Sequence, residues 1–152
     1  EELGIGTSVP EWLGSATAGI EGVDLLHPDM FNPDSMVETC ASLATSRPVT
    51  DADWAGFALA SLVHSLASLP DQLFDLTGRR IASIRIGGGG SQSSALCQAL
   101  AAATGLRVVA GPAEATVLGN LGMQFLASGV FDSFADMVAA VTRSANTIIY
   151  EP

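Results

Sequence analysis

The sequence predicts a mainly helical α/β domain with a small parallel sheet. Its 152 residues suit a single domain, and 48% hydrophobic against 14% charged residues supplies a core and argues against disorder. Apolar residues repeat at three-to-four spacing over 50–77, which is typical of a helix. Two alternating, β-branched runs flank an alanine-rich segment between 81 and 110, which predicts parallel strands joined by a helix.

The amino-terminal part divides into an irregular lead-in, residues 1–32, and a helical part, residues 33–78. Glycine and proline interrupt the lead-in, which leaves room for one short helix near Glu11–Thr17. A loop rich in turn-forming residues over 24–34 then leads to a helix near Asp34–Thr45.

The longest predicted helix runs over Thr50–Thr77. Thr50 is a suitable N-cap, and Asp53 suits the positive end of the helix dipole. Gly78 is a natural residue just beyond the helix end. Pro70 lies inside the pattern and should kink or split the helix, because it removes one backbone donor.

Residues 79–152 are expected to form strands, a glycine loop and helices. The strand Ile81–Ile86 should be central in a parallel sheet. The other expected elements are a helix at Ala95–Ala103, a strand at Leu106–Ala110, a helix at Ala113–Ser128 with Pro112 in its first turn, a helix from Asp132 or Ser133 to Asn146, and an extended tail at Ile148–Tyr150.

The charge pattern excludes several function classes. The net charge is −10, from 16 acids and 6 bases, and all six bases are arginines. Nucleic-acid binding is rejected because only Arg79 and Arg80 are adjacent. A chain without lysine also lacks a P-loop lysine and a Schiff-base nucleophile.

The sequence has no apolar window of 18 or more residues, which is the length that a transmembrane helix needs. The chain begins Glu1-Glu2, which is the wrong charge for a signal peptide. We therefore expect a cytoplasmic protein without a membrane partner. The two cysteines, Cys40 and Cys97, lie far from each other and from both histidines in sequence, which is no metal-ligand spacing. They are expected to be small buried hydrophobes, and no metal site is predicted.

A glycine run at the end of the first strand is the candidate site. Gly87–Gly90 would let the backbone approach a ligand closely, and the next helix would point free N–H groups into the same space. A dinucleotide fingerprint is disfavoured, since Ser93 replaces its third glycine and the next strand ends without an acid. A tight turn without ligand stays open as an alternative. A flexible linker is disfavoured, because a strand pattern and a helix pattern directly flank the run.

Three stretches of this chain resemble the carboxy-terminal part of FGGY-family carbohydrate kinases. The most specific is Ala110-Gly-Pro-x-Glu-Ala-Thr-x-x-Gly-Asn120, which with Phe31-Asn-Pro-Asp-Ser-Met36 favours the rhamnulokinase branch. The third is the glycine run with the Ser91-Gln-Ser that follows it. The resemblance implies part of an actin-like, RNase H-like ATPase domain.

The resemblance also implies the site residues. Gly89 would contact the adenosine part of ATP, with Gly88, Gly90 and Ser91 beside it. Ser93 stands where the family often has an asparagine near the adenine, so its reach is shorter. No catalytic residue is assigned to this chain, because the family's catalytic aspartate belongs to a motif that none of its aspartates matches. Glu114, Thr116 and Asn120 are interpreted as structural.

The implied reaction is transfer of the γ-phosphate of ATP to the 1-hydroxyl of L-rhamnulose with Mg²⁺, in a full-length parent enzyme. This chain alone is expected to be inactive, because half of the cleft lies elsewhere. Another sugar or polyol, such as xylulose, gluconate or glycerol, is the first alternative. The alternative from another class is a non-catalytic association module, for example a homodimer formed through exposed apolar surface.

Overall fold

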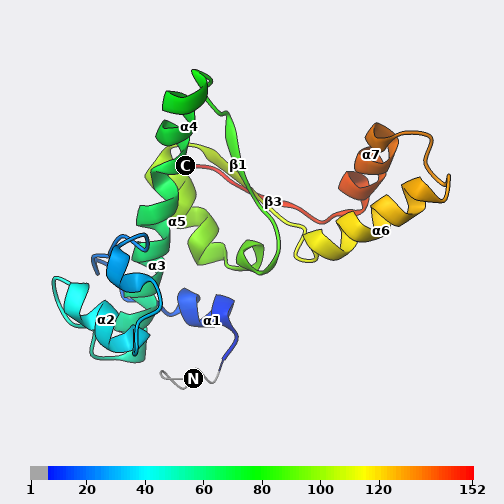
Figure 1. Cartoon of the computed structure of the whole chain (residues 1–152). Coiled ribbons are helices and arrows are strands. Elements are labelled where there is room, and N and C mark those ends of the chain that lie inside the picture. Colours follow the sequence, from blue (N-terminus) through cyan, green and yellow to red (C-terminus); the bar gives the residue numbers. More distant parts are fainter. Residues whose placement is uncertain (1–6) are drawn as a thin grey trace.

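The computed structural model describes residues 7–152, and Figure 1 shows its arrangement. The described residues begin with two short helices, α1 (Val9–Gly14) and α2 (Met36–Leu43). The 3₁₀ turn η1 (Pro28–Met30) lies between them. The helix expected near Asp34–Thr45 is therefore present, with Ser35 as its N-cap. The helix expected near Glu11–Thr17 begins and ends earlier, as α1.

The long helical segment is divided in two, as Pro70 predicts. Helix α3 spans Asp51–Ala67 and α4 spans Leu69–Thr77, and the proline lies in the first turn of α4, where its missing N–H costs nothing. Gly78 ends α4 in the left-handed conformation, with φ of +68°. The N-cap prediction for Thr50 is also confirmed, since its hydroxyl accepts a hydrogen bond from Asp53 N–H at 3.1 Å.

A strand–helix–strand unit follows, as predicted. Strand β1 (Ser83–Ile86) leads through the 3₁₀ turn η2 (Gly89–Gln92) into α5 (Ser94–Thr104), and β2 (Arg107–Ala110) comes next. The two strands pair in parallel, with Ile84 opposite Val108 and Ile86 opposite Ala110. Their carboxyl ends therefore meet at one edge of the sheet.

Two expectations about the sheet are wrong. The tail Ile148–Tyr150 forms a third strand, β3, which pairs antiparallel with β2, so the sheet is mixed rather than parallel. The order β1-β2-β3 puts β2 in the middle, whereas Ile81–Ile86 had been expected to be central. The physical reason is the path of the chain: it leaves β2, makes a helical hairpin and returns at the same end, which forces an antiparallel direction.

The hairpin consists of α6 (Ala115–Ala127) and α7 (Phe134–Ser144), and it projects away from the sheet (Figure 1). The placement of Pro112 in the first turn of α6 is wrong. The helix begins at Ala115, and Pro112 lies in the preceding loop with a cis peptide bond to Gly111. The Pro112 carbonyl oxygen accepts a hydrogen bond from Gly88 N–H in the glycine loop, which holds the proline outside the helix.

The core lies between the sheet and α5. Its buried members, Cys97, Leu100, Ala101, Val108 and Ala110, come from α5 and β2. Ile84, Ile86 and Tyr150 pack against this cluster from the strands, and Leu66 packs against it from α3. The glycine loop joins β1 to α5 and therefore rests directly on the core.

Candidate functional site

The glycine loop changes direction by a turn that only glycine adopts easily. Ile84 and Ile86 alternate with exposed residues in β1 and hold the strand on the core. Gly88 then has φ of +74° and ψ of −160°, a combination that carries a large cost for residues with a Cβ. The chain continues through η2 and enters α5, whose N-terminus faces the loop.

Hydrogen bonds inside the loop keep it compact. The hydroxyl of Ser91 donates to Gly88 O at 2.7 Å, and Ser91 N–H donates to the same oxygen at 3.1 Å. Ser93 N–H donates to Gly90 O at 3.2 Å. The loop is thus a defined turn, and the flexible-linker interpretation of its glycines is wrong for this fold.

Ser93 is the N-cap of α5. Its hydroxyl accepts a hydrogen bond from Leu96 N–H at 3.3 Å, and the residue is only 2% exposed. Ser91 is also buried, at 8% exposure. The two serines thus support the loop from within, and the assignment of Ser93 to an adenine contact stays a prediction.

Gly87, Gly89 and Gly90 are all exposed, and Gly89 has the most open surroundings of the loop glycines. A Cβ built on Gly89 would meet no atom within 4 Å, so the space beside its Cα is open. Gly90 differs, because a Cβ there would lie 3.5 Å from Ile86 Cγ2. At Gly87 the neighbour is closer, with Ala115 Cβ at 3.1 Å. A flat ligand can therefore reach the backbone of the loop at Gly89.

A second loop, Gly111–Glu114, supports the glycine loop from the end of β2. Gly88 N–H donates to Pro112 O at 3.0 Å, and Gly111 N–H donates to Ile86 O at 2.8 Å. Sequence reasoning did not include this loop in the candidate site. The Gly-Pro pair directly after a parallel strand is the signal that could have identified it, since it lies at the same sheet edge.

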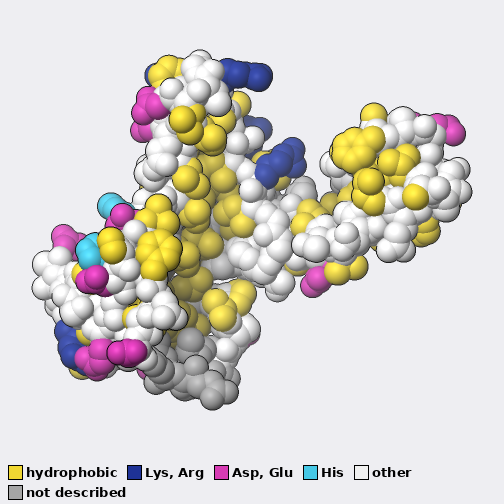
Figure 2. Space-filling model, viewed as in Figure 1, with side chains coloured by type: hydrophobic (Ala, Val, Ile, Leu, Met, Phe, Trp, Pro, Cys, Tyr) yellow, Lys and Arg dark blue, Asp and Glu magenta, His cyan; other side chains and the backbone are white. Residues whose placement is uncertain are grey.

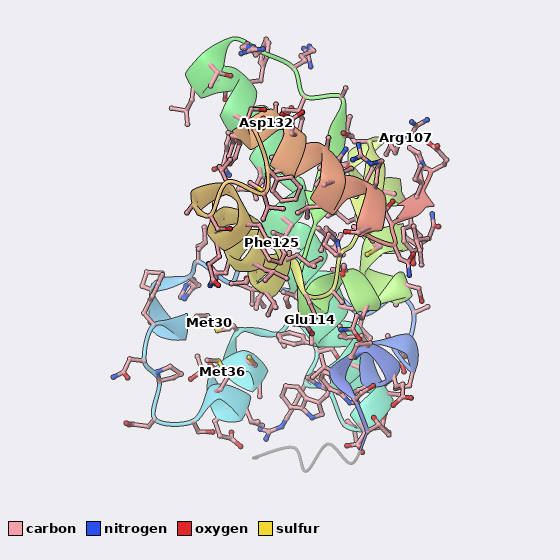
Figure 3. All side chains as sticks on the ribbon, turned by 90° about the vertical axis from the view of Figure 1, so that its right-hand side faces the viewer. Met30, Met36, Arg107, Glu114, Phe125 and Asp132 are labelled. Atoms are coloured by element: carbon pink, nitrogen blue, oxygen red, sulfur yellow. The ribbon has the colours of Figure 1, made fainter. Side chains whose placement is uncertain are left out.

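Glu114, labelled in Figure 3, is the N-cap of α6 and is exposed. Its carboxylate makes no capping hydrogen bond. Thr116 and Asn120 line the groove between α6 and α7 together with Met137 and Val141. The structure therefore places these polar residues on the hairpin and does not bring them onto the glycine loop.

Among residues 7–152, the side chain of Cys97 is one titratable group that contacts the glycine loop. Burial raises the pKa of the Cys97 thiol, which stays protonated and points to Gly90 O at a sulfur–oxygen distance of 3.9 Å. Burial likewise raises the pKa of Cys40. Within the same residues, no group of three or more His, Cys, Asp or Glu side chains could hold a metal ion.

Another concave region lies away from the loop. A cavity of about 340 Å³ between α1, η1, α2 and α3 is lined by apolar side chains that include Trp12, Trp54, Met30 and Met36. The two methionines are labelled in Figure 3. Both tryptophans therefore belong to an apolar packing region, whose lining also includes Cys40 and Ser61.

The comparison with known families decides the assignment. Residues 31–128 match the model of the FGGY family of carbohydrate kinases, C-terminal domain, which is well over half of the chain. The chain belongs to this family. The matched segment contains the complete glycine loop, α5, the Gly111–Glu114 loop and all of α6.

FGGY proteins are ATP-dependent phosphotransferases that act on sugars and generally use Mg²⁺. This membership agrees with the expected kinase class and with an actin-like ATPase relationship. No helix in residues 7–152 is long and apolar enough to cross a membrane. The family match does not distinguish one sugar from another.

Proposed function

We propose that this chain forms the nucleotide-binding side of an ATP-dependent sugar kinase. The observation that carries the proposal is the open space at Gly89, on a loop between a strand end and a helix N-terminus within the family match. Adenosine would lie against Gly89 beside Gly88 and Gly90, and the buried Ser91 would hold the turn beneath it through its bonds to Gly88 O. The positive end of the α5 dipole would face the same ligand.

Glycine at position 89 supports the proposal, because it leaves open space where adenosine would lie. A side chain at position 89 would occupy the space that the ligand needs, so glycine is suited to this position. The cofactor supplies the γ-phosphoryl group and, with Mg²⁺, neutralises its charge. As the family resemblance implies, Mg²⁺ would arrive bound to the ATP phosphates.

We further propose L-rhamnulose, phosphorylated at its 1-hydroxyl, as the sugar, in a cytoplasmic full-length enzyme. The support is sequence similarity alone: the Ala110–Asn120 segment and the Phe31–Met36 segment resemble the rhamnulokinase branch. Xylulose, gluconate and glycerol are the competing substrates. The catalytic aspartate and most sugar contacts would lie outside this chain, which by itself would not turn over substrate.

The test is an ADP-release assay on the full-length protein with Mg-ATP and L-rhamnulose, xylulose, gluconate or glycerol. Selective turnover of rhamnulose supports the whole proposal. Turnover of another substrate keeps the kinase class and rejects the branch. Intact, folded protein without turnover of any of the four would reject the sugar-kinase proposal for these substrates.

Protein association is a second candidate, favoured by the surface of the hairpin. Helix α6 contains no charged residue, and its large apolar side chains Val117, Leu121, Met123 and Phe125 are between 43% and 58% exposed. Figure 2 shows hydrophobic side chains gathered on this projecting part. Homodimerisation in sedimentation experiments without any ADP binding would favour this candidate over the kinase.

A further inference from the structure

Gly111 lies where the chain leaves the sheet, and one side of it contacts the glycine loop. Its N–H donates to Ile86 O at 2.8 Å, which extends the parallel ladder by one bond beyond the strands. The next residue, Pro112, accepts the Gly88 N–H at 3.0 Å. These two bonds fix both the last strand residue and the first turn residue of the glycine loop.

The other side of Gly111 contacts the point where the chain returns. A Cβ on Gly111 would overlap the carbonyl oxygen of Asn146, and Thr147 Cα would lie 3.5 Å away. Asn146 precedes β3, so Gly111 lies between the glycine loop and the entry to the third strand. The φ of Gly111 is +109°, which residues with a side chain rarely adopt.

The contact between Gly111 and Asn146 closes the base of the helical hairpin. Everything between these two residues, the whole of α6 and α7, lies outside the sheet. The obstacle to a side chain at position 111 is backbone rather than a flexible side-chain end. A side chain there would therefore displace either the entry to β3 or the two bonds to the glycine loop.

We infer that Gly111 is a positioning residue for the nucleotide loop. It holds Ile86 and Gly88 in place through the loop that it begins, and it does so only because it lacks a Cβ. The effect of Gly111 on ADP affinity rests on the proposed nucleotide binding. The effect of Gly111 on the glycine loop does not depend on any nucleotide.

The test uses Gly111→Ala with Gly129→Ala as the matched control. Gly129 also has a positive φ, +76°, but a Cβ there would meet nothing within 4 Å, and it lies at the far end of the hairpin. Both variants place an alanine at a positive φ, but only at position 111 does a backbone atom stand in the way of the added Cβ. Amide hydrogen exchange of Gly88 without nucleotide and ADP affinity by calorimetry are measured on folded protein, well below the unfolding temperature.

Gly111→Ala is expected to accelerate exchange of the Gly88 N–H at least about tenfold and to weaken ADP binding at least about fivefold, while Gly129→Ala changes neither. Wild-type Gly88 exchange and wild-type affinity in Gly111→Ala would overturn the inference. If the wild type binds no ADP, the nucleotide proposal and the effect on affinity fail together, and Gly88 exchange alone decides whether Gly111 positions the loop.

If Gly111→Ala does not fold, the wild type provides a second measurement. Saturation with ADP is expected to slow exchange of both the Gly88 and the Gly111 N–H, because their hydrogen bonds to Pro112 O and Ile86 O join the same two loops, while Gly129 stays unchanged. Slower exchange at Gly88 with an unchanged Gly111 would overturn the inference.

Discussion

The N–H of Gly88 donates a 3.0 Å hydrogen bond to the carbonyl oxygen of Pro112, and this bond joins the two loops at the carboxyl edge of the sheet. Gly88 begins the turn that exposes Gly89, so the loop after β2 determines how the loop after β1 is presented. Ligands of open α/β sheets bind at this edge.

Gly89→Val is expected to weaken ADP binding by about tenfold or more, because the new side chain would fill the space at the exposed face of the loop. The fold should survive, since no atom lies within 4 Å of the added Cβ. Calorimetry with ADP measures the affinity, and thermal unfolding confirms the fold.

The matched control is Gly14→Val at the end of α1, where a Cβ also meets nothing within 4 Å. It should leave ADP affinity at the wild-type value. An affinity in Gly89→Val equal to that of this control would remove Gly89 from the nucleotide site.

Ser93→Ala is expected to lower the free energy of unfolding by about 1 kcal/mol, because the variant loses the N-cap of α5. Ser133→Ala removes a cap from α7, where Ser133 Oγ accepts from Asp136 N–H at 3.1 Å and donates to Asp136 Oδ2 at 2.6 Å. Ser93 is buried and Ser133 is exposed, so water can replace only the second hydroxyl. Urea unfolding of both variants should therefore show the larger loss for Ser93→Ala, and equal losses would contradict the assignment of a buried cap.

Local signals in the sequence predicted the parts of the fold that local chemistry decides. Thr50 caps α3 and Pro70 separates α3 from α4, because each effect acts within a few residues. The glycine loop was located for the same reason, since a strand pattern ends directly before it. Here the periodicity and the turn chemistry agree with the fold.

What the sequence did not predict depends on contacts between distant residues. The direction of β3 follows from the return of the hairpin to β2, which three strand residues cannot encode. Pro112 lies outside α6 because its carbonyl oxygen accepts a hydrogen bond from Gly88 N–H. Position 111 requires glycine because a Cβ there would overlap the carbonyl oxygen of Asn146. The supporting loop of the candidate site was missed because both its partners come from other segments.

Asp53→Asn is expected to reduce the dependence of stability on acidic pH. Hydrogen bonds from the backbone and the side chain of Thr50 hold the pKa of Asp53 below its ordinary value of 3.8. Because the pKa is lower in the folded state, this contribution is complete above the unfolded-state pKa and is lost as the pH falls through the folded-state pKa. Unfolding temperatures measured from pH 6 to pH 2 should fall less steeply below about pH 4 in the variant than in the wild type, and identical slopes would contradict the prediction.

Cys97 is expected to resist alkylation in the native chain. The residue is fully buried, burial raises its thiol pKa, and the thiol points to Gly90 O, so very little thiolate is present and reagent has no access. Iodoacetamide at pH 8 should modify Cys97 at a rate set by unfolding, and peptide mass mapping would measure that rate. Gly105→Ala, which adds strain at a left-handed residue ending α5 without touching the loop, should accelerate the modification by destabilising the helix. Rapid labelling of Cys97 in fully folded wild type would contradict a closed core beneath the glycine loop.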